Sequence, residues 1–405
     1  MSEQGSAPEK HRFRLTKFWI FFIVLAVLLG IVYLLSYSQT VCDFFLDNVH
    51  PYLAAGISKV SYLIPVPLYE LLAFAALLLG VLLVVLLILL IFLRKKPKFR
   101  RFTGNYVKAA LVIGLCVGIG LLTFDSSMQR SSVLGHPDYQ AKEHSQEEVK
   151  AFWDWYVTNI NELQTQVRRD ANHHFIRPTA DEIQKTLSVT RQKLAAEYPR
   201  LKTDVPPEKT SLLSGWLRAY GIAAYTVSPT MEIVCTDRTE DRNYFASIYA
   251  HEYSHFEGFW REDEANYFGF RLCYESDDPN IRYAGFLDLY PDVAETFNKS
   301  YFGDAEVNTD DPGYLEYCEG LKEFDDVFLF LCDRSANYKK YHEMQGEENV
   351  VDEHREYAEL SDGMKQFAQD MGSRHFDNLK EQLGVHYYDG VCQLIMDEMP
   401  AATAN

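Results

Sequence analysis

Three long apolar stretches near the N-terminus constrain this chain most, because a protein that carries them must keep them out of water. They run from Phe18 to Tyr37, from Leu71 to Leu93 and from Val107 to Phe124. At 1.5 Å per residue in a helix, the first two are long enough to cross roughly 30 Å of hydrocarbon. The third is shorter and begins beside Lys108, whose aliphatic stem can carry its ammonium group to the lipid headgroups. The sequence therefore predicts a three-helix transmembrane region within residues 18–124.

A cleaved signal peptide is the alternative interpretation of the first stretch. The apolar run is long for a signal peptide, and no small-residue cleavage pattern follows Tyr37. We therefore favour a membrane anchor that stays in the mature protein.

The orientation in the membrane is predicted from the basic residues beside the stretches, because Lys and Arg close to span ends stay in the cytoplasm. The connection between the first and second stretches holds only Lys59. We expect a multi-pass protein of the cell membrane, with residues 1–17 in the cytoplasm and residues 125–405 outside it. The basic residues before the first stretch and between the second and third are Lys10, Arg12, Arg14, Lys17, Arg94, Lys95, Lys96, Lys98, Arg100 and Arg101.

Charge and cysteine content exclude some classes of function. The net charge of −18 argues against a nucleic-acid partner, because phosphate binding requires a basic surface. The cysteines show no CxxC spacing, so neither a zinc ribbon nor a thioredoxin-like motif is expected. Five of them are candidates either for disulfides or for buried apolar positions: Cys235, Cys273, Cys318, Cys332 and Cys392.

The segment after residue 125 reads as a mainly helical α+β domain with a small sheet. Ser145–Glu148 and Thr179–Glu182 fit the capping box at a helix start, in which the hydroxyl and the carboxylate each bind the other residue's backbone amide. A proline-containing loop is expected from Pro199 to Lys209. Short strands are expected at Gly221–Val227 and Met231–Cys235. The expected helices are Ala151–Val167, Ile183–Tyr198, Val351–Met371 and Phe376–Met399.

The pentapeptide His251-Glu252-Tyr253-Ser254-His255 has the pattern HExxH. On a helix, side chains four residues apart project from one face, so both imidazoles can bind one zinc ion. Glu252 points to the side and can reach a metal-bound water without displacing a ligand, as a general base must. A pair of surface histidines on an ordinary helix is the alternative, because the pattern also occurs by chance.

Glu262 is the favoured third metal ligand. An unbroken helix would place it about 10 Å beyond His255, so the chain must turn first, and Gly258 can supply that turn. On a second helix Glu262 shares a small, apolar face with Asn266, whereas Glu264 lies on a bulkier face. We therefore prefer Glu262 to Glu264 as the ligand, with Asn266 holding a histidine in place.

One competing spacing fails at a single residue. HExxHxxGxx followed by a third ligand is the metzincin pattern, and here that position is Arg261. Arginine stays protonated and cannot bind zinc.

The stretch from His251 to Phe268, HEYSHFEGFWREDEANYF, together with the three spans, resembles the bacterial family called domain of unknown function 3810. The resemblance continues into Arg282–Gly285 and Gly384–Val385, and it implies architecture rather than a substrate. More distantly, Glu262-x-x-Ala-Asn266 is similar to the ExxAD element of membrane-bound prenyl-protein and heat-shock endopeptidases and to the ExEAN element of the ImmA and IrrE regulators. In those gluzincin-like groups the first glutamate is the ligand. This chain has asparagine where many of them have aspartate, and a shorter gap between the two motifs.

These observations predict a membrane-anchored zinc metallopeptidase with a zincin-like domain that acts on a protein or peptide of the cell envelope. Zn²⁺ would be held by His251, His255 and Glu262, with Glu252 as the catalytic base. A zinc-binding sensor or scaffold without hydrolytic activity is the main alternative. An intramembrane protease is disfavoured, because charged residues surround the motif.

Other roles stay open at this stage. Met231–Cys235 is either an edge strand that binds substrate or an ordinary core strand. His173 and His174 are interpreted as capping or surface residues. Candidate donors to the transition state are Tyr283, Tyr317 and His386.

Overall fold

The computed structural model describes residues 16–237, 239, 242–302, 333, 390–399 and 402. The chain divides into two compact units. The first comprises Met1–Cys42 and Ala76–Arg130, and the second Asp43–Ala75 and Ser131–Asn405. Residues 43–75, which connect the first two apolar stretches and begin the second, therefore belong to the second unit.

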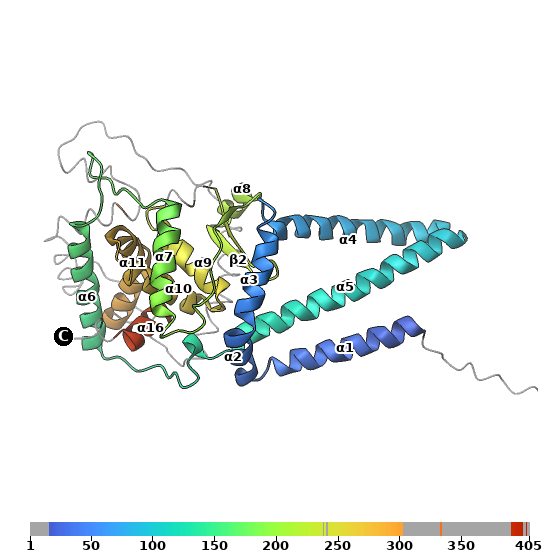
Figure 1. Cartoon of the computed structure of the whole chain (residues 1–405), viewed down its shortest axis with the longest axis horizontal. Helices are drawn as coiled ribbons and strands as arrows, with labels where there is room; N and C mark the ends of the chain where they lie inside the picture. The colour runs from blue at the N-terminus through green and yellow to red at the C-terminus, as the bar shows by residue number, and fades with distance from the viewer. Residues whose placement is uncertain are drawn as a thin grey trace, which may run out of the picture. The chain divides into compact units, whose positions relative to one another are not determined.

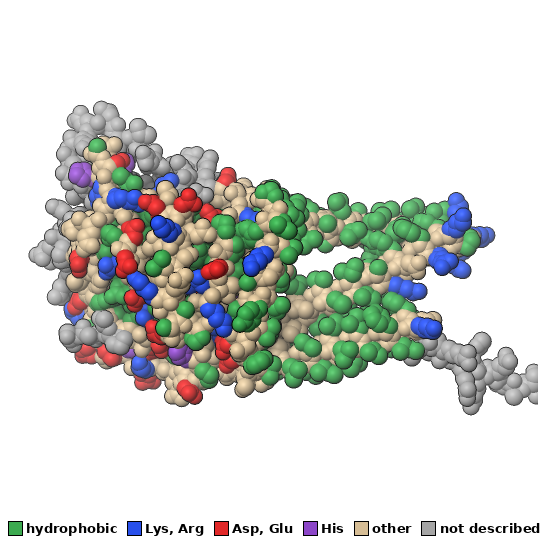
Figure 2. Space-filling view, in the orientation of Figure 1, with side chains coloured by type: hydrophobic (Ala, Val, Ile, Leu, Met, Phe, Trp, Pro, Cys, Tyr) green, Lys and Arg blue, Asp and Glu red, His purple; other side chains and the backbone are tan. Residues whose placement is uncertain are grey.

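Three helices are long and apolar enough to cross a membrane: α1 (Lys17–Leu35), α4 (Leu68–Leu93) and α5 (Pro97–Arg130). This finding supports a multi-pass membrane protein. Helices α4 and α5 contain the second and third predicted stretches, and α5 extends beyond Val107–Phe124 at both ends. Helix α1 ends at Leu35, two residues before the predicted end of the first stretch at Tyr37. Apolar side chains cover these helices, with basic side chains where α4 meets α5 (Figure 2).

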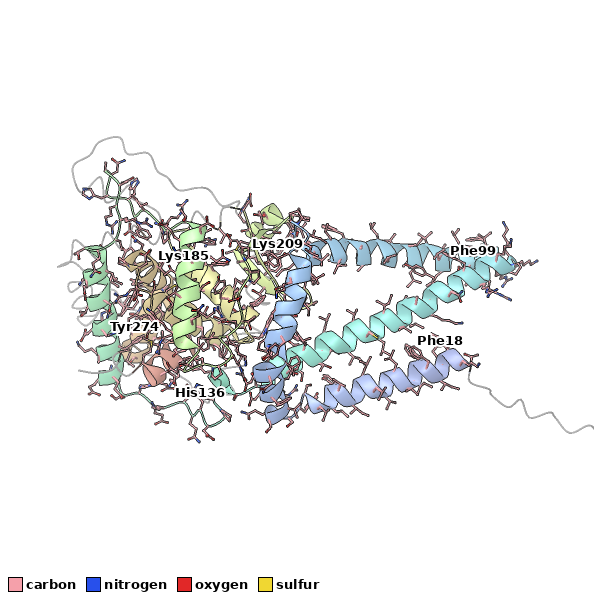
Figure 3. All side chains as sticks on the ribbon, viewed as in Figure 1. Phe18, Phe99, His136, Lys185, Lys209 and Tyr274 are labelled. Atoms are coloured by element: carbon pink, nitrogen blue, oxygen red, sulfur yellow. The ribbon has the colours of Figure 1, made fainter. Side chains whose placement is uncertain are left out.

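Within the first unit, the starts of α1 and α5 lie at the same end. Phe18 and Phe99 are both found there (Figure 3), and Lys108 Nζ lies 5.3 Å from the centre of the Phe18 ring. Tyr106 of α5 donates a hydrogen bond to Leu79 O of α4 at 2.7 Å. The basic residues next to these positions therefore gather at one end of the unit, as a common membrane face requires.

The second unit is mainly helical (Figure 1). Both capping boxes are confirmed, at Ser145 before α6 and Thr179 before α7. The predicted helix Val351–Met371 lies outside the described residues, as do Tyr317, His386, Cys318 and Cys332. Only the last part of the predicted Phe376–Met399 is described, as α16. The helical segments are α2 (Gln39–Asn48, which starts in the first unit), α3 (His50–Ser61), η1 (Val133–Gly135), α6 (Gln146–Gln164), α7 (Ala180–Leu194), α8 (Ser214–Ala219), α9 (Phe245–Phe256), α10 (Glu262–Tyr274), α11 (Pro279–Phe302) and α16 (Gly390–Glu398).

Three short strands form the sheet: β1 (Lys209–Thr210), β2 (Ala224–Val227) and β3 (Glu232–Cys235). Their order is β1-β3-β2, with β3 parallel to β1 and antiparallel to β2. Both predicted strands are therefore confirmed. Of the two roles considered for Met231–Cys235, the structure shows the core strand, because β3 is central and all four of its residues are buried. The edge strand that packs against α9 is β2.

The core of the second unit forms where α9, α10, α11 and α16 meet. Glycines permit the close approach of these helices. A Cβ on Gly269 would lie 3.2 Å from His251 N, and one on Gly285 would lie 2.7 Å from Cys273 Cβ. The face of α10 that was expected to be small therefore packs on α9. Cys235, Cys273 and Cys392 are all buried, and none of these three is bonded to another.

Helix α3 and the first turn of α4 are built into the second unit. Ser61 donates to Thr230 O at 2.6 Å, just before β3. The backbone amides of Leu68 and Tyr69 donate to the Glu232 carboxylate of β3 at 2.9 and 3.0 Å. The sheet is therefore attached directly to the start of α4, a contact that no local sequence pattern predicts.

Candidate metal centre

The side chains of His251, His255 and Glu262 come together at one point. His251 Nε2 lies 3.3 Å from Glu262 Oε2, and His255 Nε2 lies 3.7 Å from Glu262 Oε1. One ligand atom from each residue falls within 4.8 Å of the other two. Two imidazole nitrogens and a carboxylate oxygen are a donor set that Zn²⁺ accepts, and three protein ligands leave a fourth position open. Among the described residues, no other group of histidine, cysteine and carboxylate side chains converges in this way.

The turn between the two helices depends on Gly258. Helix α9 ends at Phe256 and α10 begins at Glu262, so the predicted break is confirmed. Gly258 has φ +102°, a left-handed conformation that favours glycine. A Cβ there would also lie 3.2 Å from His50 Cδ2 of α3. Backbone conformation and close packing therefore both require glycine at this position.

A protein acceptor fixes each imidazole. His251 Nδ1 lies 2.7 Å from Asn266 Oδ1, and His255 Nδ1 lies 2.9 Å from Phe259 O. Because an amide oxygen and a carbonyl oxygen only accept hydrogen bonds, both Nδ1 atoms donate. Both Nε2 atoms therefore point toward Glu262. Burial opposes the charged imidazolium, but the hydrogen bond to Glu262 raises the pKa of His251 to about 9, so metal binding at this Nε2 would displace a proton. The position of Asn266 agrees with the sequence analysis, but a backbone carbonyl such as Phe259 O carries no sequence signal.

Glu264 turns away from the candidate centre. Its carboxylate is buried, lies 3.1 Å from Arg261 Nη1 and accepts a hydrogen bond from Leu134 N at 2.6 Å. The Glu262 side chain, in contrast, remains one-third exposed beside the two histidines. Of the two glutamates, Glu262 therefore lies with the histidines, whereas Glu264 joins α10 to the segment at Val133–Gly135.

Glu252 lies next to the three converging residues and is held by the sheet. Thr226 Oγ1 of β2 donates to Glu252 Oε2 at 2.7 Å. Burial disfavours the charged carboxylate and raises the pKa of Glu252 to about 7. A glutamate with this pKa can both accept and return a proton near neutral pH. Thr226 was missed because the contact between β2 and α9 is tertiary.

Trp260 forms a further wall of the site. Its ring stacks on the His255 ring, with centroids 5.3 Å apart and an interplanar angle of 28°. Burial lowers the pKa of His255 to about 4, so this imidazole is neutral at pH 7 and able to bind a metal. Trp260 lies in the link between the two helices, where sequence patterns gave it no role.

The other candidate residues lie in different surroundings. The Tyr283 hydroxyl is buried and donates to Asp333 at 2.6 Å, where Arg169 also binds. His174 Nδ1 lies 3.5 Å from Asp170, in a turn where His173 has φ +64°. Tyr283 therefore has a structural bond, and the two histidines lie in a turn as expected.

Comparison with known protein families identifies the family of this chain. A family model described as "Protein of unknown function (DUF3810)" matches residues 45–309, about two thirds of the chain. The chain belongs to the DUF3810 family. No curated protein and no solved structure matches it.

The extent of the DUF3810 match is informative about the site. It begins within α2, continues through α4 and α5, and ends shortly after α11. The matched region therefore contains the three converging residues, Glu252, the sheet and helix α3. In this DUF3810 protein, α3 and the candidate metal centre both lie within the region that the family model matches.

Proposed function

We propose that this protein is a membrane-anchored zinc metallopeptidase of the gluzincin type with a zincin-like domain. The observation that carries the proposal is the convergence of His251, His255 and Glu262 within 4.8 Å, with Glu252 alongside. Three ligands with an open fourth position are typical of catalytic zinc sites, whereas structural zinc sites have four protein ligands.

The chemistry follows from the positions of these side chains. Bound Zn²⁺ would polarise the scissile carbonyl and the attacking water. Glu252 takes the proton of that water and delivers it to the leaving amine, a role that suits its raised pKa. Thr226 orients Glu252, while Asn266 and Phe259 O orient the histidines.

The edge strand β2 is the best candidate to bind the substrate backbone. Among the described strands β2 pairs only with β3, so its other edge is open to an extended peptide. Thr226 lies on this strand and contacts Glu252. A protein or peptide segment paired with β2 would run beside the general base.

We place this activity outside the cytoplasm. The basic residues gather at the end of the first unit that holds Phe18 and Phe99, and positive residues remain in the cytoplasm. Three crossings then put residues 131–405 on the outer side. The substrate is therefore a polypeptide of the bacterial cell envelope.

Glu252→Gln tests the proposal against a zinc-binding sensor or scaffold. The full chain, purified in detergent, should contain about one zinc per chain and cleave members of a peptide library. Glu252→Gln should keep the zinc and lose cleavage, because glutamine cannot accept the proton. Absence of zinc from the wild-type chain would reject the metal site, and zinc without cleavage would favour the sensor or scaffold.

A further inference from the structure

Helix α3 has three sides with different surroundings. One side is buried in the second unit, where Ala54 joins the core and His50 Nε2 lies 3.0 Å from Phe256 O. A second side carries exposed apolar residues. The third side lines a groove. Burial in the domain explains the first side only, so the other two need a separate explanation.

The exposed apolar side consists of Leu53, Val60 and Leu63, with exposed fractions of 46%, 62% and 80%. Their spacing puts them on one stripe that continues the helix line past Ser61. Phe44 of the preceding helix α2 is also 62% exposed. Large exposed apolar side chains grouped in this way mark a surface that a partner covers.

Covalent connections identify the partner. Residues 36–67 join two membrane-spanning helices, so both ends of this segment reach the same membrane surface. Leu63 is five residues from Leu68, where α4 begins, and cannot be more than about 17 Å from it. The sheet also holds the first turn of α4 through Glu232. The nearest apolar partner for this stripe is therefore the bilayer.

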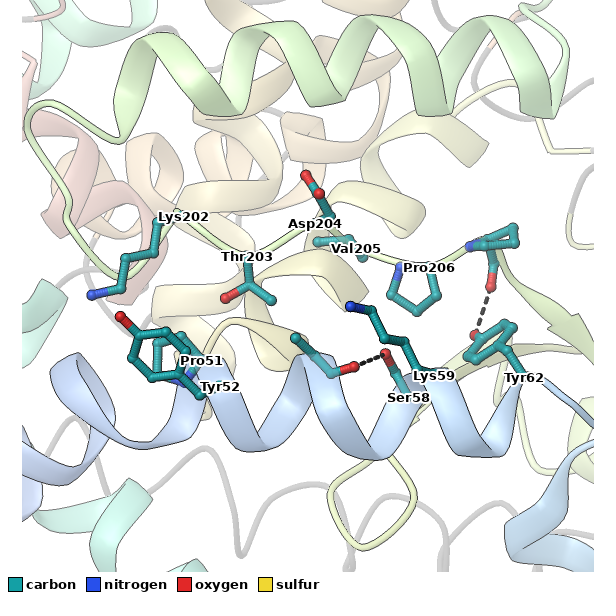
Figure 4. Close-up of a pocket in the computed structure, with 12 residues that line it drawn as sticks. Pro51, Tyr52, Ser58, Lys59, Tyr62, Lys202, Thr203, Asp204, Val205 and Pro206 are labelled. Atoms are coloured by element: carbon teal, nitrogen blue, oxygen red, sulfur yellow. Dashed lines mark hydrogen bonds between the residues drawn. The ribbon is translucent and has the colours of Figure 1, made fainter.

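The third side faces a groove of about 660 Å³ between α3 and residues 202–207 (Figure 4). Tyr62 closes one end by donating to Pro207 O at 2.6 Å. Lys59 and Lys202 reach into the groove from opposite walls (Figure 4). Lys202 Nζ donates one hydrogen bond to Asp47 O at 2.6 Å, which leaves two of its three donors for a ligand.

Of two further side chains of the groove, one favours an anionic ligand and one carries a negative charge. Thr203 is 6% exposed, and its hydroxyl has no hydrogen-bond partner among the described residues. A ligand oxygen would remove the free-energy cost of this unpaired group. Asp204 brings a negative charge to the groove, but its carboxylate already lies 3.1 Å from Arg191 Nη2. The two ammonium groups therefore dominate the charge of the groove.

We propose that α3 lies in the membrane interface and that the groove beside it binds the anionic headgroup of a phospholipid. At 100° per residue, Tyr52 and Lys59 lie on the helix between the apolar stripe and the groove. One lipid can therefore place its acyl chains along Leu53 and Val60 and its phosphate near Lys59. The lysine stem follows the apolar surface while its ammonium group stays among the headgroups.

This arrangement also fixes where the candidate metal centre lies. Phe256 O contacts His50, and Phe256 follows His255 directly in α9. Helix α9 therefore ends against the buried side of α3. With a helix diameter of about 10 Å, the centre lies within roughly two helix diameters of the bilayer.

The first test measures whether α3 is covered by lipid. Leu63→Cys and the control Val189→Cys, which replaces a 50% exposed residue of α7, are introduced into the full chain in lipid nanodiscs. A charged maleimide should label Val189→Cys rapidly and Leu63→Cys at least tenfold more slowly, with wild-type labelling subtracted. Both should label equally after denaturation. Equal rates in the nanodiscs would overturn the interfacial position of α3.

The second test measures lipid retention by native mass spectrometry of the full chain in detergent with added lipid. The wild type should retain phosphatidylglycerol in preference to phosphatidylcholine. Loss of each lysine should lower retention about fivefold, so the double variant Lys59→Ala and Lys202→Ala should lose most of it. Lys185→Ala, on the exposed side of α7, should retain the lipid like the wild type.

Two outcomes of the second test would overturn the headgroup site. The first is equal retention of phosphatidylglycerol by the double variant and the wild type, which is also expected if a polypeptide occupies the groove. The second is a wild-type chain that retains both lipids equally. Thermal unfolding of each variant shows whether it is folded, so loss of the fold is distinguished from loss of the site. Neither test depends on zinc or on hydrolysis.

Discussion

The two histidines of the candidate centre differ in how their rings are held. Asn266 of α10 fixes the His251 ring, whereas the His255 ring is fixed by the backbone of the link between the helices at Phe259. A side chain can be replaced, but the Phe259 carbonyl depends on the path of the chain after Gly258. The orientation of His255 is therefore coupled to the turn, and that of His251 to the packing of α10.

We predict that replacement of Glu262 causes loss of the metal. Glu262→Ala removes a ligand and should give mostly metal-free protein after dialysis against a weak chelator. Asn266→Ala should retain zinc with about 10 to 100-fold lower affinity, because only the hydrogen bond to His251 is lost. Zinc stoichiometry of the purified full-length variants measures both effects. Retention of a full zinc equivalent by Glu262→Ala would exclude this residue as a ligand.

Glu264 supplies the control for this series. Glu264→Gln should keep its zinc, since the side chain points to Arg261 and Leu134 N. Glutamine preserves an acceptor for Leu134 N but loses the charge next to buried Arg261. The variant should therefore unfold at a lower temperature while its metal content stays unchanged. Zinc loss in a folded Glu264→Gln would reverse the assignment of the two glutamates.

Residues of the site were predictable where the cause is local. The spacing of His251 and His255 places them on one helical face in any helix, and the break at Gly258 follows from the distance that Glu262 must recover. Thr226, Trp260 and Phe259 O were not predictable. Their roles depend on contacts between β2, α9 and the link, which no local pattern encodes.

The turn between α9 and α10 sets the distance between His255 and Glu262. We predict that Gly258→Ala destabilises the second unit by about 1–3 kcal/mol, because an alanine strains the left-handed backbone and crowds His50. Zinc affinity should fall with it, since His255 and Glu262 lie on opposite sides of the turn. Thermal unfolding and zinc titration of the full chain measure the two effects.

Gly221→Ala is the matched control for this turn. Gly221 also has a positive φ of +76°, but a Cβ there would meet no atom within 4 Å. This variant should show a smaller loss of stability and unchanged zinc affinity. Equal loss of zinc affinity in both variants would show that the effect is general destabilisation rather than the geometry of the turn.

For helices and strands, the sequence predicted which segments form them better than how these segments pack together. Capping boxes marked the starts of α6 and α7, and two apolar stretches separated by Ser228 and Pro229 marked β2 and β3. The order β1-β3-β2 was not predictable, because three short strands can pair in several ways. The sequence pattern also did not predict that α3 is buried on one side. An amphipathic helix has one apolar and one polar side, whereas α3 has a buried side, an exposed apolar side and a side that lines a groove.

At the scale of the whole molecule, the first turn of α4 belongs to the second unit and not to the first. Glu70, in this turn, accepts hydrogen bonds from Ser211 at 2.5 Å, Leu212 N at 2.8 Å and the Tyr225 hydroxyl at 2.6 Å. Tyr225 lies on β2, the candidate substrate-binding strand. Strand β2 is therefore bound to the first turn of α4 within the second unit.

The orientation of the whole chain is the last prediction. The basic residues at the start of α1 and between α4 and α5 should face the cytoplasm, because moving such clusters across the membrane is costly. Alkaline phosphatase, which is active only outside the cytoplasm, should therefore be active when fused after Asn405 and inactive when fused after Lys96. A fluorescent protein that matures only in the cytoplasm should give the opposite pattern. Phosphatase activity at Lys96 together with fluorescence after Asn405 would invert the topology and place the candidate metal centre in the cytoplasm, where an envelope polypeptide could not reach it.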